Sequence, residues 1–407
     1  MRVLLLGGVF DDSHNDEIVS KTRTYVEYAA NNFQKKIIGG LQECGIDLEV
    51  ISAPFIGAYP NAYADWYFDG FDPRVIDNSG YKYVNFINVW GIRNLSRSRA
   101  ARRALKDFID SNDSDKLIIV YTSHTPLIQA ANYAKKKDSR IKICLVVPDL
   151  PQYMNLADNV STVYKIMKKF DVKAFQKENA LVDSYVILTE PMAEDLKIGK
   201  RPYCVVEGIY QEVCRTNLER ENTDIRTIVY TGKLDRSFGI MNLVDAFMKI
   251  DDENLRLLIC GSGEEKENVI RCIEQDKRIL YKGQVTSDVA RQYILEGDVL
   301  VNPRQNNSDY TKYSFPSKII DYLATGNPVV AYKLDGMPKQ YRDFIYFVPD
   351  DTVEALKKTI MEVLYGDEEI RIIKSQKALQ YLQSGISQKE VAKKILFMNV
   401  EKDFTGV

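Results

Sequence analysis

Histidine is scarce in this sequence, because only His14 and His124 occur among 407 residues. A zinc site would therefore have to be assembled from widely separated residues. The six cysteines show no CxxC spacing and several lie in apolar runs, so we expect reduced core residues rather than metal ligands or disulfides. The single DxD, Asp113 to Asp115, stands in a polar stretch before an apolar run. We expect a loop there, not a manganese site, and chemistry without a metal.

Long apolar runs are also missing, and none reaches the roughly 18 residues that a membrane-spanning helix needs. The apolar start, Met1 to Gly8, is short and is followed at once by Asp11 and Asp12, which is unlike a signal peptide. We interpret it as a first buried strand. The sequence predicts a soluble protein located in the cytoplasm.

Two common nucleotide fingerprints are absent. Only Gly7-Gly8 follows the first expected strand, where a GxGxxG motif would stand, and GxxxxGK[ST] occurs nowhere. Nicotinamide chemistry and P-loop chemistry both lose their usual signature.

The net charge of −2 argues against a nucleic-acid partner, but the charge is uneven. Residues 82–177 hold 18 Lys and Arg against 8 Asp and Glu. These residues either form an ordinary solvated surface or attract an anionic partner. That partner could be an anionic membrane, such as the inner face of the cell membrane, or a phosphate-bearing lipid acceptor. The basic positions are Arg99, Arg102, Arg103 and Lys106 on one expected helix, and the runs Lys135–Lys137 and Lys165–Lys169.

Short β-branched runs alternate with helical patterns throughout, which predicts an α/β protein with two Rossmann-like, doubly wound domains. We expect an N-terminal domain over 1–208, a C-terminal domain over 209–385, and a terminal helix within 386–407 that packs back on the first domain. The junction should lie near Cys204 to Cys214, before the polar stretch Arg215 to Thr223. The expected strands are Val3–Leu6, Leu48–Ile51, Leu117–Tyr121, Ile141–Val147, Ser184–Leu188, Ile228–Tyr230, Leu255–Cys260, Ile279–Tyr281, Val299–Asn302, Val329–Tyr332 and Ile345–Val348.

The segment Tyr313 to Val330 predicts a loop, a short helix and a strand. Ser314 or Ser317 can cap the helix, Pro316 suits its first turn, and Gly326 suits its left-handed end. A helix N-terminus offers free amides and a positive dipole end to a phosphate. Lys318 adds a charge there, and Asp321 can reach the hydroxyls of a ribose. A purely structural capped helix is the alternative.

A second segment, Val229 to Ile240, leaves a strand, turns at Gly232 and enters a helix. The first βα turn of a Rossmann-like domain lies where ligands bind, so Lys233 would point at a diphosphate unless it is simply solvated. Arg304, after a later strand, is a third cation that could converge on the same place.

Three further regions fit a ligand without being specific. Cys260 to Gly263 and Lys282 to Val285 end strands with glycines that allow close backbone approach. The long region Ala53 to Asn94 is rich in aromatics, which either pack as an ordinary loop or form a platform for an acceptor sugar.

Together these motifs resemble the family 4 retaining glycosyltransferases of the GT-B fold, in the bacterial polysaccharide branch. In the second half the matching motifs are Tyr230–Leu234, Cys260–Gly263, Tyr281–Val285 and Ser317–Val330, in family order. In the first half they are Gly7-Gly8, Tyr121–Pro126 and Val147–Pro151.

The resemblance implies a nucleotide-sugar, held in a cleft between the two domains, as donor. A UDP-sugar is the donor most expected, with no further cofactor. Lys233, His124 and Lys318 would be catalytic, with Lys233 on the diphosphate and His124 at the donor hexose, although a core histidine remains an alternative. The donor-binding set would be Gly7, Gly8, Gly232, Gly261, Gln284, Val285, Arg304, Ser314, Phe315, Pro316, Ser317 and Asp321.

Two positions depart from the family pattern. The family has two glutamates eight positions apart, where this chain has Tyr313 and Asp321, and Phe238 replaces a basic residue before the glycine of the phosphate turn. Backbone around Ser314 to Ser317 could then hold the sugar, and Lys318 or Arg304 could supply the missing charge.

The resemblance implies retention of configuration and transfer of a hexose to a carbohydrate or lipid-linked glycan in cell-surface polysaccharide synthesis. A nucleotide-sugar 2-epimerase shares the architecture and stays open as an alternative. So does a non-catalytic donor-binding or scaffold subunit, an alternative that Tyr313 at the first glutamate position keeps open.

Overall fold

The computed structural model describes residues 1–72, 74–151, 162–212, 224–307 and 309–400. The chain forms two compact units, Met1–Ile209 together with Gln388–Val407, and Tyr210–Ser387. Cys214 and the stretch Arg215 to Thr223 lie outside the described residues, as do the side chains of Lys165 to Lys169.

The first unit is built on a seven-stranded sheet of parallel pairs in the order β4-β2-β1-β6-β7-β8-β9. After their first residues, Arg2 and Lys116, the central strands β1 and β6 are buried, and their sequences are continuous apolar runs rather than alternating ones. The strands are β1 (Arg2–Gly7), β2 (Leu48–Ser52), β4 (Lys82–Tyr83), β6 (Lys116–Tyr121), β7 (Ile141–Val147), β8 (Ser184–Ile187) and β9 (Tyr203–Val205), with β3 (Tyr67–Phe68) and β5 (Phe86–Ile87) forming a separate antiparallel pair.

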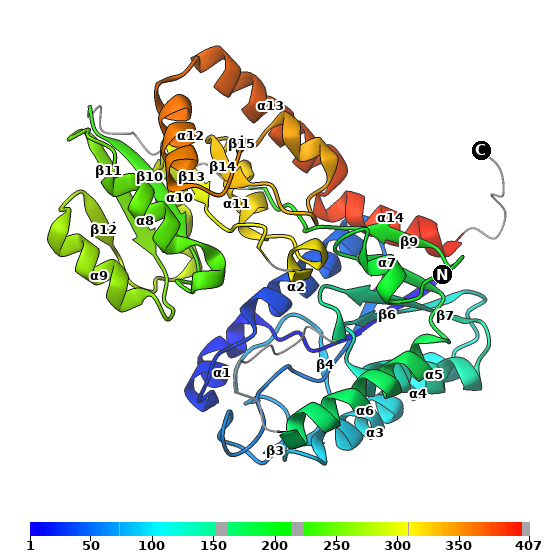
Figure 1. Cartoon of the computed structure of the whole chain (residues 1–407). Coiled ribbons are helices and arrows are strands. Elements are labelled where there is room, and N and C mark those ends of the chain that lie inside the picture. Colours follow the sequence, from blue (N-terminus) through cyan, green and yellow to red (C-terminus); the bar gives the residue numbers. More distant parts are fainter. Residues whose placement is uncertain (73, 152–161, 213–223, 308, 401–407) are drawn as a thin grey trace. The chain divides into compact units, whose positions relative to one another are not determined.

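Helices cover both faces of this sheet, because the chain runs from β1 to β2 in one direction and from β6 to β8 in the other. Helices α3, α5 and α6 pack side by side, while α2 packs with α14 (Figure 1). The helices of this unit are α1 (Asn15–Lys21), α2 (Tyr28–Glu43), α3 (Arg93–Ala104), α4 (Lys106–Asp110), α5 (Thr125–Lys137), α6 (Thr162–Asn179), α7 (Met192–Asp195) and α14 (Gln388–Val400), with a short 3-10 turn η1 (Asp12–His14).

Helix α14 is the last described element and returns to the first unit. Gly40 of α2 leaves no room for a Cβ atom against the backbone of Gln388. At the other end of α14, Oγ of Ser184 donates to Oδ1 of Asn399 at 2.7 Å. In Figure 1 the red α14 lies along the blue α2.

The second unit has a six-stranded parallel sheet in the order β12-β11-β10-β13-β14-β15. Helix α8 contacts both α9 and α12, and α11 contacts β13, β14 and α13. The strands are β10 (Arg226–Thr231), β11 (Leu255–Cys260), β12 (Ile279–Tyr281), β13 (Val299–Asn302), β14 (Val329–Tyr332) and β15 (Tyr346–Val348). The helices are α8 (Ile240–Met248), α9 (Lys266–Gln275), α10 (Ser287–Glu296), α11 (Lys318–Ala324), α12 (Val353–Tyr365) and α13 (Glu368–Gly385), with the 3-10 turns η3 (Arg236–Phe238), η4 (Asp309–Tyr313) and η5 (Lys339–Asp343).

Two expectations about the surface of the first unit were wrong in detail. Lys106 does not continue the basic helix, because α3 ends at Ala104 and Lys106 begins α4. Arg102 turns toward α5, with its guanidinium carbon 5.4 Å from the ring centre of Tyr133. Only Arg99 and Arg103 of the four remain exposed on α3.

The aromatic region Ala53 to Asn94 divides into an inner and an outer group. Phe68 and Phe71 are in contact, and Phe71 stacks on His14 with ring centres 4.1 Å apart. Nε2 of His14 lies 3.1 Å from Oδ2 of Asp77. Trp66, by contrast, keeps 59% of its surface exposed. The inner aromatics are core, so an acceptor platform could use only the outer ones.

Candidate functional site

The turn after β10 is built from backbone that lies too close to its neighbours for side chains. Gly232 has φ +143°, and its N–H donates to the carbonyl of Cys260 at 2.9 Å. A Cβ atom on Gly261, with φ +137°, would collide with the carbonyl oxygen of Gly232. Only glycine fits these conformations. The carboxyl ends of β10 and β11 are therefore held together, at the edge where parallel sheets bind ligands.

The amine of Lys318 lies directly over this turn. Its Nζ is 4.2 Å from the ring centre of Tyr230, and a Cβ atom on Gly232 would collide with it. Nζ is buried and has no hydrogen-bond partner among the residues that the structure describes. An amine in this setting lacks a counter-charge, so the position is suited to an anion.

Tyr322 fixes Lys318 in this place. It lies one turn further along α11, and its hydroxyl accepts a bond from the N–H of Thr231 at 2.9 Å. The bond ties the middle of α11 to the end of β10, which places the start of α11 over Gly232.

Arg304 reaches the same area from the loop after β13. A Cβ atom on Gly239 would collide with the carbonyl of Pro303, so this loop lies against the end of the Gly232 turn. The ring of Phe238 has the guanidinium carbon of Arg304 at 5.5 Å and Nζ of Lys318 at 5.8 Å from its centre. Phe238, which stands where the family pattern has a basic residue, therefore lies beside two cations.

Burial changes the ionisation of both cations. It lowers the pKa of Lys318 from 10.5 to about 7, with a smaller lowering from the charge of Arg304. The pKa of Arg304 is lowered for the same reason, its burial. Two desolvated positive groups that repel each other would be stabilised by a phosphate.

Lys233, Ser317 and Asp321 lie at the surface of this region. The carbonyl of Lys233 accepts a bond from Oη of Tyr230 at 2.5 Å, which locks its backbone. Gln284 is exposed just after Gly283, whose carbonyl accepts from the N–H of Gly261 at 2.8 Å. The predicted residues Gly232, Lys233, Gly261, Arg304 and Lys318 thus come together on one edge of the second sheet, with Gln284 and Val285 in the loop after the neighbouring strand.

The predicted capping of α11 was wrong. Ser317 stands at the N-cap position, but it has helical backbone angles and its side chain makes no capping bond. The hydroxyl of Ser314 is buried without a partner among the described residues. Pro316 supplies the first turn through its carbonyl, which accepts from Ile319 at 2.9 Å, and Phe315 packs on Tyr341. Gly326 has φ +74° just after the helix, as predicted.

In the first unit, Gly7, Gly8 and His124 lie at the carboxyl ends of β1 and β6, where the strand order reverses. The N–H of Gly8 donates to Oε1 of Gln34 at 2.9 Å, and Phe55 fills the space beside Gly8. The ring of His124 meets Phe55 edge-on at 5.8 Å. Its Nδ1 is buried without a partner among the described residues, and burial, then Arg97 and Arg93, hold its pKa well below 6.5.

Arg93 and Arg97 were not predicted as functional residues. They stand four residues apart on α3, in the series that continues with the buried Ala101 and Leu105. That spacing places all four on one helix face. It was the signal in the sequence that could have separated these arginines from the exposed Arg99.

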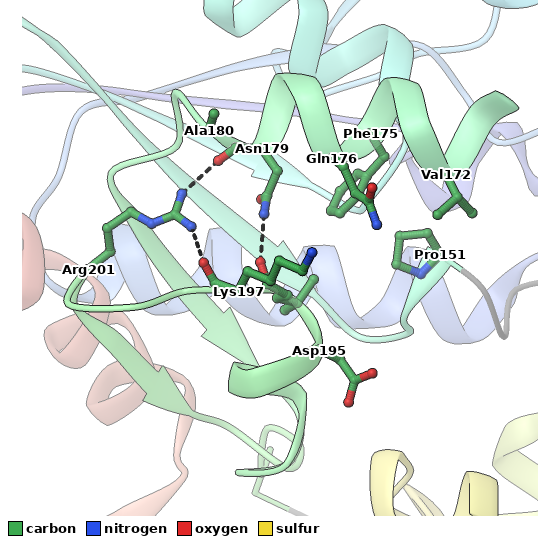
Figure 2. Close-up of a pocket in the computed structure, with 10 residues that line it drawn as sticks. Pro151, Val172, Phe175, Gln176, Asn179, Ala180, Asp195, Lys197 and Arg201 are labelled. Atoms are coloured by element: carbon green, nitrogen blue, oxygen red, sulfur yellow. Dashed lines mark hydrogen bonds between the residues drawn. The ribbon is translucent and has the colours of Figure 1, made fainter. Parts of the chain in front are cut away.

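A cavity of about 270 Å³ lies elsewhere in the first unit and contains none of the predicted catalytic or donor-binding residues (Figure 2). Arg201 donates to the carbonyls of Asn179 and Lys197, both at 2.7 Å, and Nδ2 of Asn179 donates to the carbonyl of Leu196 at 2.9 Å. These bonds close the end of α6, so we regard the cavity wall as structural. The remaining wall is formed by Pro151, Val172, Phe175, Gln176, Ala180 and Asp195.

Residues 225–365 match the profile of the family described as "Glycosyl transferases group 1". The matched residues lie within the second unit. A shorter relationship reaches a trehalose phosphorylase from Pleurotus pulmonarius, 29% identical over 141 residues. That alignment spans 28% of this chain and 18% of the phosphorylase.

The similarity to solved structures extends over both units of this chain. S. aureus TarM, determined with fondaparinux, alpha-GlcNAc-glycerol and UDP, has a TM-score of 0.61 at 12% identity and covers 98% of this chain and 100% of its own. Sucrose-phosphate synthase from Thermosynechococcus elongatus has a TM-score of 0.63 at 15% identity, with 98% of each chain covered. The lipopolysaccharide outer core galactosyltransferase WaaB has a TM-score of 0.60 at 15% identity, covering 98% of this chain and 99% of its own. The fold is GT-B, as the sequence predicted.

Membrane-spanning helices and metal-binding clusters are both absent from the residues that the structure describes. No helix there has the length and apolarity required to cross a bilayer. No group of three His, Cys, Asp or Glu side chains there is arranged to hold a metal ion.

Proposed function

We propose that this protein is a metal-independent, retaining glycosyltransferase that transfers a hexose from a nucleotide diphosphate sugar, most simply a UDP-sugar, to a glycan acceptor. One observation carries the proposal. Within the group 1 domain, the unpartnered amine of Lys318 lies over Gly232, with Arg304 across the ring of Phe238. UDP in the TarM structure and the sucrose-phosphate synthase relationship support a nucleotide-linked donor.

The proposed chemistry follows from where charge develops. As the glycosidic bond to the diphosphate breaks, the sugar becomes oxocarbenium-like and negative charge grows on the leaving phosphate. Fixed positive groups at that phosphate lower the barrier, by about 3 to 4 kcal/mol each when compared with oxyanion-hole donors. Lys318, Arg304 and the exposed Lys233 are the groups for this role.

The other predicted residues have supporting roles in the proposal. Asp321 lies one turn after Lys318 and would bind the ribose, while Gln284 and Val285 would bind the base through their backbone. His124 of the first unit would meet the donor hexose. Retention follows if the leaving phosphate takes the acceptor proton on the same face, since no protein base is then required.

We also propose that the acceptor belongs to cell-surface polysaccharide and is met at an anionic membrane on its cytoplasmic side. Ile92, just before α3, and Leu95 on α3 are each 51% exposed, and Arg99 and Arg103 of the same helix are exposed as well. Tyr67, Ile92, Leu95, Arg99 and Arg103 are among the residues that line a cavity of about 260 Å³. Basic residues near an anionic surface contribute about 1 kcal/mol each.

Replacing Lys233 tests the function. Lys233→Ala should abolish transfer and weaken UDP binding while the melting temperature stays unchanged, because its side chain is exposed. Lys200→Ala, at another exposed lysine that lies in the first unit, is the control and should behave as wild type. Unaltered transfer by Lys233→Ala would contradict the phosphate assignment. Turnover of the donor without any acceptor would instead favour the 2-epimerase, and UDP-sugar binding without turnover the scaffold subunit.

A further inference from the structure

Helix α3 directs two arginines into the interior of the first unit. Arg97 keeps only 2% of its surface exposed. Its Nη2 donates to the carbonyl of Pro54 at 2.7 Å, and Nη1 of Arg93 donates to the carbonyl of Ile56 at 3.2 Å. Both guanidinium groups therefore point at the loop that follows β2.

The positive charge of this pair is not balanced by any carboxylate among the described residues. Burial lowers the pKa of both arginines, Arg93 lowers that of Arg97 further, and no described carboxylate raises either. Nε of Arg97 is buried without a hydrogen-bond partner among the described residues. Desolvated charges of one sign are unfavourable unless an opposite charge joins them.

The contacts of the two arginines within the protein use only part of their hydrogen-bond donors. The guanidinium of Arg97 lies 4.3 Å over the ring of Phe86. Each guanidinium has five N–H donors, and the carbonyls of Pro54 and Ile56 accept only one from each arginine. Their planar fork matches a carboxylate or a phosphate.

The pair lies at the ligand-binding edge of the sheet. Burial, and then the charges of Arg97 and Arg93, lower the pKa of His124, which follows β6. The ring of His124 contacts Phe55, which belongs to the loop whose carbonyls bind both arginines. Phe55 also packs on Gly8, which follows β1. Strand order reverses between β1 and β6, the position where open parallel sheets bind ligands.

We propose that Arg93 and Arg97 form a subsite for a negatively charged group of the acceptor, a phosphate or a carboxylate. This rests on the proposed function, because it is the transfer reaction that brings an acceptor to His124. The acceptor class is then an anionic glycan rather than a neutral sugar.

Calorimetric titration of the full-length protein, saturated with UDP, tests the subsite. The probes are inorganic phosphate, methyl glucuronide and the neutral methyl glucoside. We expect at least one anion to bind more tightly than the glucoside, and the tighter anion identifies the source of the charge. Arg93→Gln should weaken that binding about tenfold or more. Arg23→Gln is the matched control, because Arg23 is exposed and also donates to a loop carbonyl, that of Pro60.

A second variant covers the risk that a buried change disturbs folding. Arg97→Lys keeps the charge but loses the fork, and should also weaken anion binding at an unchanged melting temperature. Equal binding of glucoside and anions, no anion binding, or wild-type anion binding by a folded Arg93→Gln or Arg97→Lys would overturn the subsite. Failure of the proposed function would be seen separately, as absent UDP binding or absent transfer in the wild-type protein.

Discussion

The Nζ atom of Lys318 occupies the space beside Gly232 that a side chain at residue 232 would need. The two residues belong to different elements, the turn after β10 and the start of α11. The bond from Thr231 to Tyr322 brings those elements together. The amine of Lys318 therefore lies against the backbone of Gly232, and several consequences of that contact can be measured.

Gly232→Ala should damage both stability and nucleotide binding. The new methyl group would collide with Nζ of Lys318, and φ of +143° is strained for alanine, so we expect a loss of about 1 to 3 kcal/mol. Gly45→Ala is the control, since Gly45 has φ +73° with open space around it and would show backbone strain alone. Thermal unfolding and UDP titration measure the two effects. Equal behaviour of the two variants would contradict the collision.

Stability and nucleotide affinity should respond to pH in opposite directions. The pKa of Lys318 is about 7 in the folded protein and near 10.5 when unfolded, so between these values the unfolded chain binds more protons. Lys318 therefore makes the free energy of unfolding increase as pH rises from 7 toward 10.5. A bound diphosphate favours the charged amine, so UDP affinity should fall by up to about tenfold per pH unit above 7.

Calorimetry at pH 8 in buffers of different ionisation enthalpy measures this coupling. The wild-type protein should take up close to one proton on binding UDP, and Lys318→Met should take up none. A wild-type affinity that stays constant between pH 7.5 and pH 9 would argue against it.

Moving the charge from residue 318 to residue 238 should preserve function in part. Lys318→Met alone should weaken UDP binding about tenfold or more, because it removes a charge-assisted contact. Phe238→Lys combined with Lys318→Met returns a cation to the family's usual position, beside Arg304, and should recover binding. Phe238→Met combined with Lys318→Met is the matched neutral control. Equal binding by the two double variants would show that the charge is not interchangeable.

The sequence was most informative for the buried strands. The strands Ile141–Val147 and Leu255–Cys260 have the predicted bounds, because a short apolar, β-branched run between polar turns is typical of a buried strand. The strands β4 and β9 were missed, since they are short, partly exposed edge strands without such a run. The predicted boundary after residue 208 lies one residue before the division at Ile209.

The chemistry of the second unit was only partly predictable. Lys318 could be placed at the start of a helix from local sequence, but its burial over Tyr230 depends on contacts between segments far apart in the chain. The inward turn of Arg93 and Arg97 was missed for a related reason. A helix rich in arginine resembles a solvated one until the loop that it covers is known, and here that loop offers the carbonyls of Pro54 and Ile56.

The return of α14 to the first unit has a consequence for biosynthesis. The chain completes its N-terminal unit with residues from Gln388 onward, after all of Tyr210–Ser387 has been made. Domains generally fold as units while the ribosome is still adding residues. The second unit can therefore mature first, while the earlier-synthesised unit waits with the α2 surface uncovered, a natural target for chaperones on the nascent polypeptide.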